Sequence, residues 1–308
     1  MNTQAAPDQS HLAVGYEDFL KRTTQDSDDR YGVSIAPAAT ALWETLRTLD
    51  LLENIAELEI KGLTVIAPDK VASPEFIERI NNAIDRVARQ RYPDRDNVAK
   101  GAFGEVLPYM LFEDDVFQEA VLNPVVLALT TYLVGENSFL FNCMAVIKRA
   151  GSSDLYLHCD HAMHSAPFAP HVNICNLTMA LSEYSQENGA LCYVPGSHRY
   201  YRHPMPGEGV DQRVVVNAAP GSLIVWSGNT WHGAFQRTAP GTRKSLIIGM
   251  ARPFVRPQEL YKEHVTPELL DKHPTRFRKL MGQHIGWGWK EEGLTNPNTL
   301  DVGRHVYD

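Results

Sequence analysis

A histidine and an aspartate stand two residues apart at His158 and Asp160, at the end of the stretch "LYLHCD". On a β-strand, side chains at positions i and i+2 leave from the same face, so both could reach one metal ion while Cys159 turns away. The chain has 12 histidines, and a surface histidine beside an aspartate explains this pattern as well when it is taken alone. A metal site therefore needs a third ligand from elsewhere in the chain.

The candidate third ligand is His232, in "GSLIVWSGNTWHGAFQ", where a turn follows an apolar strand. Two imidazoles and one carboxylate form a facial set that leaves adjacent coordination positions open, as non-haem Fe(II) oxygenases require. Zinc hydrolases more often carry His-Glu-x-x-His, which the sequence lacks. The pattern therefore favours an iron site made of His158, Asp160 and His232.

The residues before about 138 predict helices that flank the site. Residues 1–30 are polar and predict a loosely ordered arm, and helical signals dominate about 37–135. Ser73 is expected to cap one helix, with Pro74 in its first turn. A further helix is expected to start at Pro124 and to end at a left-handed cap on Gly135.

From residue 138 the periodicity changes to that of strands. About 138–255 contains seven or eight short segments rich in β-branched and aromatic residues, punctuated by Gly, Pro, Asn and Ser. This spacing predicts a jelly roll, the double-stranded β-helix of cupin-like proteins. Helices return in a tail over 256–308. We expect an α+β fold in which 31–308 form a single domain, with a β core flanked by helices that are mainly N-terminal.

Composition narrows the class of partner. The net charge of the 308-residue chain is −8, with no basic run, which argues against a nucleic-acid or anionic-membrane partner. The start "MNTQAAPDQS" lacks the charge and apolar segment of a signal peptide, and four cysteines without Cys-x-x-Cys pairing predict reduced thiols. We expect a cytoplasmic protein. A homodimer is one admissible assembly, which the sequence neither requires nor excludes.

The segment from about 138 to 252 resembles the phytanoyl-CoA dioxygenase (PhyH) family of Fe(II)- and 2-oxoglutarate-dependent oxygenases. The resemblance rests on "HCD", "ENGALCYVPGSHR", "GSLIVWSGNTWHG" and "TRKSL", in that order. It implies that His158, Asp160 and His232 bind Fe(II), that 2-oxoglutarate is the cosubstrate and O2 the oxidant. It also implies that Arg243 grips the distal carboxylate of 2-oxoglutarate, a task that suits the planar fork of arginine.

The resemblance implies further contacts less directly. Thr178, Asn142 and Ser245 fall at positions where similar enzymes contact the cosubstrate, although a structural role fits each equally well. Lys148 is expected to end a strand in solvent. Candidate substrate contacts are bulky residues and a lid histidine, for which a core or solvated role remains open: Phe103, Met163, His164, Phe168 and Trp231.

The predicted activity is oxidation, by preference hydroxylation, of a C–H bond in a small apolar or natural-product-like molecule, with release of succinate and CO2. Two alternatives share the jelly roll and the histidines: a cupin-like metal-dependent isomerase or hydrolase, and a cupin that binds a ligand without turnover. The cupin without turnover has no reason to carry Arg243 at the cosubstrate position. Production of succinate from 2-oxoglutarate in air would distinguish the oxygenase from both alternatives.

Overall fold

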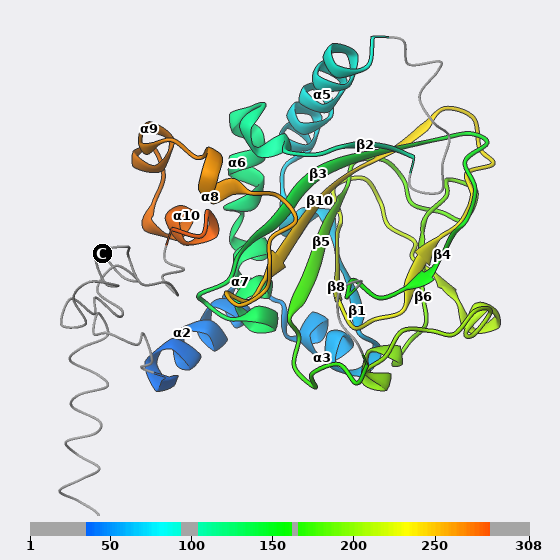
Figure 1. Cartoon of the computed structure of the whole chain (residues 1–308), viewed down its shortest axis with the longest axis horizontal. Helices are drawn as coiled ribbons and strands as arrows, with labels where there is room; N and C mark the ends of the chain where they lie inside the picture. The colour runs from blue at the N-terminus through cyan, green and yellow to red at the C-terminus, as the bar shows by residue number, and fades with distance from the viewer. Residues whose placement is uncertain (1–34, 94–103, 162–165, 284–308) are drawn as a thin grey trace, which may run out of the picture. The chain divides into compact units, whose positions relative to one another are not determined.

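The computed structural model describes residues 35–93, 104–161 and 166–283, with side chains from residue 41 onward. Residues 46–282 form one compact unit, and this unit contains every strand of the described chain (Figure 1). Helix α2 (Ile35–Thr48) belongs in its greater part to a second unit made of residues 1–45 and 283–308. The expected arm at 1–30 lies outside the described residues.

Two β-sheets carry the site. Strand order in the six-stranded sheet is β1-β8-β5-β10-β3-β2, and in the four-stranded sheet β4-β9-β6-β7; all neighbours pair antiparallel. The strands of the described chain are β1 Leu63–Ile66, β2 Glu105–Leu107, β3 Phe139–Arg149, β4 Leu155–His158, β5 Ile174–Ala180, β6 Leu191–Tyr193, β7 Val214–Val215, β8 Leu223–Ser227, β9 His232–Ala234 and β10 Thr242–Ala251.

Helices begin and end where local chemistry allows. In the compact unit they are α3 Leu52–Lys61, α4 Pro68–Val71, α5 Pro74–Arg91, η2 Met110–Phe112, α6 Asp115–Val121, α7 Pro124–Val134, η3 Ser197–Tyr200, η4 Val210–Gln212, α8 Tyr261–His264, α9 Pro267–Asp271 and α10 Thr275–Leu280. Ser73 caps α5 as predicted, since its hydroxyl accepts a hydrogen bond from the Phe76 amide at 3.3 Å.

The end of α7 differs from the prediction in one respect. Gly135 follows the last residue of the helix and has a positive φ of 91°, but its ψ is 166°, so it lies outside the left-handed helical region expected for it. Glycine is still required there because other residues avoid this part of the Ramachandran map. At the other end, the Asn123 side chain accepts from the Val125 amide at 2.9 Å.

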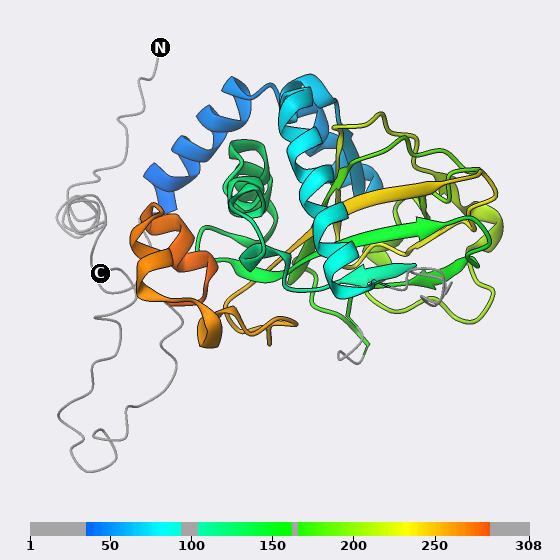
Figure 2. The same ribbon diagram turned by 90° about the horizontal axis from the view of Figure 1, so that it is seen from above.

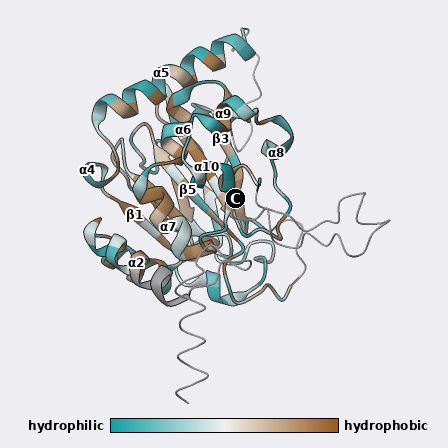
Figure 3. Cartoon of the chain, turned by 90° about the vertical axis from the view of Figure 1, so that its left-hand side faces the viewer, coloured by the Kyte–Doolittle hydropathy of each residue, from teal (hydrophilic) through white to brown (hydrophobic). Residues whose placement is uncertain are grey.

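The helices gather on the side of the six-stranded sheet that faces away from β4 and β6 (Figures 1 and 2). Helix α7 contacts β5 and β10, α10 contacts β3 and α3 contacts β8. Helix α5 is tied to the sheet by Lys244, whose ammonium lies 2.7 Å from the Asp85 carboxylate. Colouring by hydropathy shows apolar residues along the strands and α7, while α5 alternates between apolar and polar positions (Figure 3).

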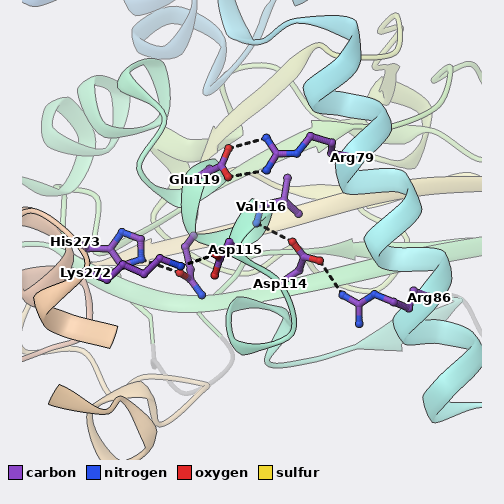
Figure 4. Close-up of polar contacts among 9 residues, drawn as sticks. Arg79, Arg86, Asp114, Asp115, Val116, Glu119, Lys272 and His273 are labelled. Carbon is purple, nitrogen blue, oxygen red and sulfur yellow. Dashed lines mark hydrogen bonds and ion pairs between the residues drawn. The ribbon is translucent and has the colours of Figure 1, made fainter. Parts of the chain in front are cut away.

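Ion pairs join α5, α6 and the end of α9 at the surface (Figure 4). Arg79 makes two hydrogen bonds to Glu119, at 2.9 and 2.7 Å, and further pairs are Arg86–Asp114, Lys272–Asp115 and His273–Gln118. The charged side chains of the three ion pairs are largely exposed, so each ion pair adds little stability on its own. Their geometry fixes how the outer helices sit against one another.

An apolar cluster fills one part of the space between the two sheets. The larger sheet contributes Leu63, Ile224 and Trp226 to this cluster, and the smaller sheet contributes Leu191 and Tyr193. A cavity occupies another part of this space. The packed cluster therefore keeps the facing surfaces of the two sheets apart, as in a jelly roll with an open interior.

Two short strands were missed by the sequence analysis. Strands β1 and β2 lie in the stretch that was predicted to be helical. Each has only three or four residues, too few to show a period of two against the surrounding pattern.

Within the described residues, no single helix has the length and hydropathy to cross a membrane. Helices α6 and α7 reach that threshold only when counted together, and they are bent by 49° where they meet.

Candidate metal centre

Three side chains converge at one end of the cavity. His158 ends β4, Asp160 follows two residues later, and His232 begins β9 directly opposite His158. One ligand atom from each of the three lies within 4.8 Å of the others, and no other such group occurs among the residues that the model describes. The structure thus brings together the three residues that the sequence singled out.

A β-bulge in β4 aims His158 inward. Leu155 pairs with Ala234 and His158 with His232, so β4 has one more residue between the two pairs than β9. Leu155 and His158 consequently both line the cavity, whereas strict alternation would send residues three apart to opposite faces. Tyr156, inside the bulge, is 75% exposed. The spacing of the two histidine ligands therefore depends on an irregularity of the sheet.

Backbone carbonyls orient both imidazole rings. Nδ1 of His158 lies 2.9 Å from the Tyr156 carbonyl oxygen, and Nδ1 of His232 lies 3.0 Å from the Thr230 carbonyl oxygen. Because a carbonyl only accepts, these contacts assign the proton of each neutral ring to Nδ1. Nε2 of each ring then carries the lone pair, the nitrogen through which histidine can bind a metal in this orientation.

Two donors hold the far oxygen of Asp160. The Asn176 amide donates to Oδ2 at 2.8 Å and the Trp226 indole N–H donates to the same atom at 3.0 Å. The other oxygen, Oδ1, lies 3.5 Å from Nε2 of His232. The carboxylate is therefore placed to offer one oxygen, and it leaves room beside it.

The environment favours the neutral form of His158. Burial, and next the neighbouring His232, lower the pKa of His158 to about 4. An uncharged ring keeps its lone pair available at neutral pH. Two imidazole nitrogens and one monodentate carboxylate fit a divalent first-row metal such as Fe(II).

The cavity beside these ligands has a volume of about 650 Å³. Its wall is mostly apolar, with side chains from both sheets and from the segment after β10. The apolar members include Phe141, Met144, Val146, Leu155, Ile174, Leu191, Ile247, Phe254, Val255 and Pro257. This volume and lining suit a cosubstrate together with a small molecule.

An unsatisfied arginine lies in the wall of the cavity. Arg243 is only 5% exposed, and its guanidinium carbon stands 4.6 Å from the centre of the Tyr184 ring. Within the described residues, Nε of Arg243 and the hydroxyl of Thr178 are buried without a hydrogen-bond partner. Buried polar atoms of this kind are costly unless a ligand satisfies them. Their positions fit the carboxylate of a keto acid.

Ser245 and Asn142 also line this cavity. Ser245 follows Arg243 by two positions on β10 and shares its face, with a residue exposure of 1%. The amide of Asn142 is already engaged at both ends: Oδ1 accepts from the Gly249 amide at 3.0 Å and Nδ2 donates to Gln258 at 2.6 Å. Asn142 thereby ties β3 to β10 and to the segment that follows β10.

The expectation that Lys148 ends a strand in solvent is wrong. Lys148 is 1% exposed, faces Arg243 across the β3–β10 pair, and donates to the Phe235 carbonyl at 2.5 Å. Burial, and then the charge of Arg243, lower its pKa to about 8. The sequence could have indicated that Lys148 points into the cavity. It continues the alternate positions Asn142, Met144 and Val146 of β3, whose side chains lie on the same face of the strand.

The expected substrate contacts divide into two groups. Trp231 and Phe168 are not among the residues that line the cavity; they pack with Cys159 and Val194 in a separate apolar cluster. Trp231 precedes a ligand on its strand, so alternation turns it to the opposite face, where its indole donates to the Arg202 carbonyl at 2.8 Å. Phe103, Met163 and His164 lie outside the described residues.

Several curated relatives are named dioxygenases. The chain is 25% identical over 179 residues to dioxygenase af480 of Aspergillus fumigatus, covering 56% of this chain and 57% of that protein. It is 26% identical over 198 residues to dioxygenase cdmD of Talaromyces verruculosus, covering 61% and 62%. The match thus spans less than two thirds of either relative's length.

Solved structures resemble this fold. HygX from Streptomyces hygroscopicus, with nickel and 2-oxoglutarate bound, has a TM-score of 0.55 at 18% identity over 68% of this chain and 89% of that one. The non-heme alpha ketoglutarate dependent carbocyclase SnoK from nogalamycin biosynthesis has a TM-score of 0.56 at 17% identity over 70% and 91%. At this identity the likeness concerns the fold, and the predicted fold class is confirmed.

A model of one protein family matches more than half of the chain. It is described as phytanoyl-CoA dioxygenase (PhyH) and covers residues 59–245, from the end of α3 to Ser245. This span includes the three converging side chains, His158, Asp160 and His232, and also Arg243. The chain belongs to the phytanoyl-CoA dioxygenase (PhyH) family.

Proposed function

We propose that this protein is an Fe(II)- and 2-oxoglutarate-dependent oxygenase that oxidises, by preference hydroxylates, a C–H bond of a small molecule and releases succinate and CO2. One observation carries the proposal. A facial set of two imidazoles and one carboxylate shares a cavity with a buried arginine that has no partner at Nε among the described residues. A metal-dependent hydrolase or a non-catalytic cupin needs the first feature and not the second.

His158, Asp160 and His232 would hold the metal. When bound, a ferrous ion with 2-oxoglutarate supplies the oxidation of a C–H bond by O2, coupled to decarboxylation of the keto acid. The part played by the chain is to present Nε2 of each histidine and Oδ1 of Asp160, and to keep the remaining positions clear. Asn176 and Trp226 serve the second purpose, because they hold Oδ2 away from the centre.

Arg243 would bind the distal carboxylate of 2-oxoglutarate through two parallel hydrogen bonds. The Tyr184 ring supports the plane of the guanidinium, and Thr178 and Ser245 offer hydroxyls from the same wall. Lys148 adds a second cation on the neighbouring strand. A carboxylate bound here would accept hydrogen bonds from Nε of Arg243 and from the hydroxyl of Thr178, which have no partner among the described residues. Satisfying these two buried groups favours binding.

The apolar wall would bind the substrate and exclude water from the reacting bond. The structural neighbour SnoK, named as a carbocyclase from nogalamycin biosynthesis, supports a small, natural-product-like molecule.

Succinate release tests the proposal. The purified protein is incubated in air with Fe(II), ascorbate and 2-oxoglutarate, and succinate is measured with and without a metabolite extract. We expect a slow background that requires iron and O2, increased by a fraction of the extract. His158→Ala should abolish both rates while the circular dichroism spectrum stays unchanged. Absence of succinate from the iron-loaded wild type, with and without every fraction, would refute the proposal.

A further inference from the structure

A short segment after β10, residues 252–259, forms one side of the cavity mouth, and we call it the mouth segment. Five consecutive residues of it, 254–258, line the cavity. Figure 1 shows it as the yellow to orange stretch between β10 and α8. The mouth segment therefore forms part of the cavity wall where the substrate would bind. It follows the end of β10, whereas Arg243 lies near the start of that strand.

Both ends of the mouth segment are fixed to the sheet. At its start, the Arg252 guanidinium donates to the Val172 carbonyl at 2.6 Å. At its end, the amides of Gln258 and Glu259 both donate to the Phe141 carbonyl at 3.1 Å. Phe141 can accept them because it is the extra residue of a bulge, between the pairs Asn142–Gly249 and Leu140–Met250. The segment is thus a fixed part of the site.

Arg256 is the charged residue of this segment that lines the cavity. It is exposed, and its neighbours Phe254, Val255 and Pro257 are apolar. Its side chain makes no ion pair or hydrogen bond with any of the described residues. An arginine that is placed at an opening, between apolar side chains and without a carboxylate, is available to a ligand.

The charges of the cavity wall support an anionic ligand. Among the lining residues, Asp160 is the one carboxylate, against Lys148, Arg243 and Arg256. A ferrous dication and a 2-oxoglutarate dianion cancel each other, so their binding leaves the surplus of positive charge unchanged. Arg243 and Lys148 lie beside each other, and in the proposed function both interact with the cosubstrate. Arg256, at the mouth, has no such role. The remaining positive charge at Arg256 favours an anionic group of a ligand at the mouth.

We infer that Arg256 binds a carboxylate of the substrate, so that the substrate is an amphipathic acid with its apolar skeleton against the mouth segment and the cavity wall. This inference rests on the proposed function for its site and deepens it by naming the class of substrate. A single guanidinium matches one carboxylate bidentately, while the neighbouring apolar side chains offer nothing further to a polyanion. The acid group sets which C–H bond reaches the metal.

A matched pair of fluorescent probes tests the inference without knowledge of the substrate. The probes are 11-(dansylamino)undecanoic acid and its methyl ester, which differ only in the charge of one end. Each is titrated into the protein loaded with Zn(II) and 2-oxoglutarate, which prevents turnover. The variants are Arg256→Gln, Arg256→Lys and, as a matched control, Arg89→Gln, an exposed arginine of α5 that does not line the cavity.

Wild type and Arg89→Gln should bind the acid more tightly than the ester, by about fivefold. Arg256→Gln should remove this preference by weakening the acid alone, and Arg256→Lys should retain part of it. A preference that persists in Arg256→Gln, or a wild type that shows none, would overturn the inference. Failure of the proposed function is seen separately, as absence of succinate from iron-loaded wild type without any probe.

Discussion

Asn176 and Trp226 stand opposite each other on β5 and β8, and both donate a hydrogen bond to the same oxygen of Asp160. A cross-strand pair in the wall of the sheet thus decides how the carboxylate ligand can bind. With Oδ2 occupied, Asp160 presents Oδ1 alone, and the centre keeps the open positions that its chemistry needs.

Trp226→Phe should weaken metal binding by about tenfold, because it removes one of the two donors and keeps most of the ring that packs against His232. Affinity is measured by competition with a chelator, using Fe(II) under anaerobic conditions. Trp231→Phe is the matched control, since it removes an indole donor to a backbone carbonyl from a residue that does not line the cavity. Equal affinities for the two variants would show that the Trp226 bond has no part in ligation.

Arg243→Ala should raise the KM for 2-oxoglutarate strongly and that for the prime substrate little, because the loss of charge pairing costs about 2–4 kcal/mol. Lys244→Gln is the comparison: the next residue on β10, it faces away from the cavity and pairs with Asp85. Steady-state rates of succinate formation measure both. A KM for 2-oxoglutarate that is unchanged in Arg243→Ala would remove this arginine from the cosubstrate site.

Lys148 should make 2-oxoglutarate binding depend on pH. Its folded-state pKa is lowered to about 8, chiefly by burial, so its ammonium is present below that pH and is lost as the pH rises through it. A dianion prefers the charged form, and its affinity should therefore fall between about pH 7 and pH 9. Equilibrium titration of 2-oxoglutarate into the Zn(II)-loaded protein measures this. Lys148→Met should bind 2-oxoglutarate more weakly at pH 7, and its affinity should change less with pH. A pH profile of affinity identical to that of wild type would show that Lys148 does not contribute to 2-oxoglutarate binding.

Gly233→Ala should disturb the pair of histidine ligands. A Cβ at this position would meet the backbone carbonyl oxygen of Leu155 at 2.5 Å, so β4 and β9 would have to separate. We expect a loss of about 1–3 kcal/mol in the free energy of unfolding and weaker metal binding. Gly207→Asn serves as the control, because an added Cβ meets nothing within 4 Å there and asparagine tolerates its positive φ of 80° better than other non-glycine residues do. Unfolding by urea and chelator competition report the two effects, and wild-type values for both in Gly233→Ala would contradict this account of the strand pair.

Much of the site could be predicted from the sequence because its chemistry depends on residue types that are scarce and regularly spaced. His158, Asp160 and His232 were found in this way, and Ser73 as the cap of α5 followed from local rules. The fold class followed from the change of periodicity near residue 138.

The rest depended on irregularities and on pairing between distant strands. The bulges at Tyr156–Leu157 and Phe141 shift side chains by one position, and no local signal marks them. Trp226 and Asn176 are 50 positions apart in a chain whose strand order the sequence does not state, so their common target could not be foreseen. Trp231 was misplaced because it was chosen as a bulky apolar residue, and size and polarity do not show on which face of the sheet a side chain lies.

Diffraction from crystals grown with Mn(II) and 2-oxoglutarate under anaerobic conditions tests the central claim most directly. At the manganese edge, the anomalous map should show one peak about 2.0–2.3 Å from Nε2 of His158, Oδ1 of Asp160 and Nε2 of His232. The keto acid should lie beside it, with its distal carboxylate on Arg243. A peak elsewhere, or a metal enclosed by protein atoms on every side, would contradict the account.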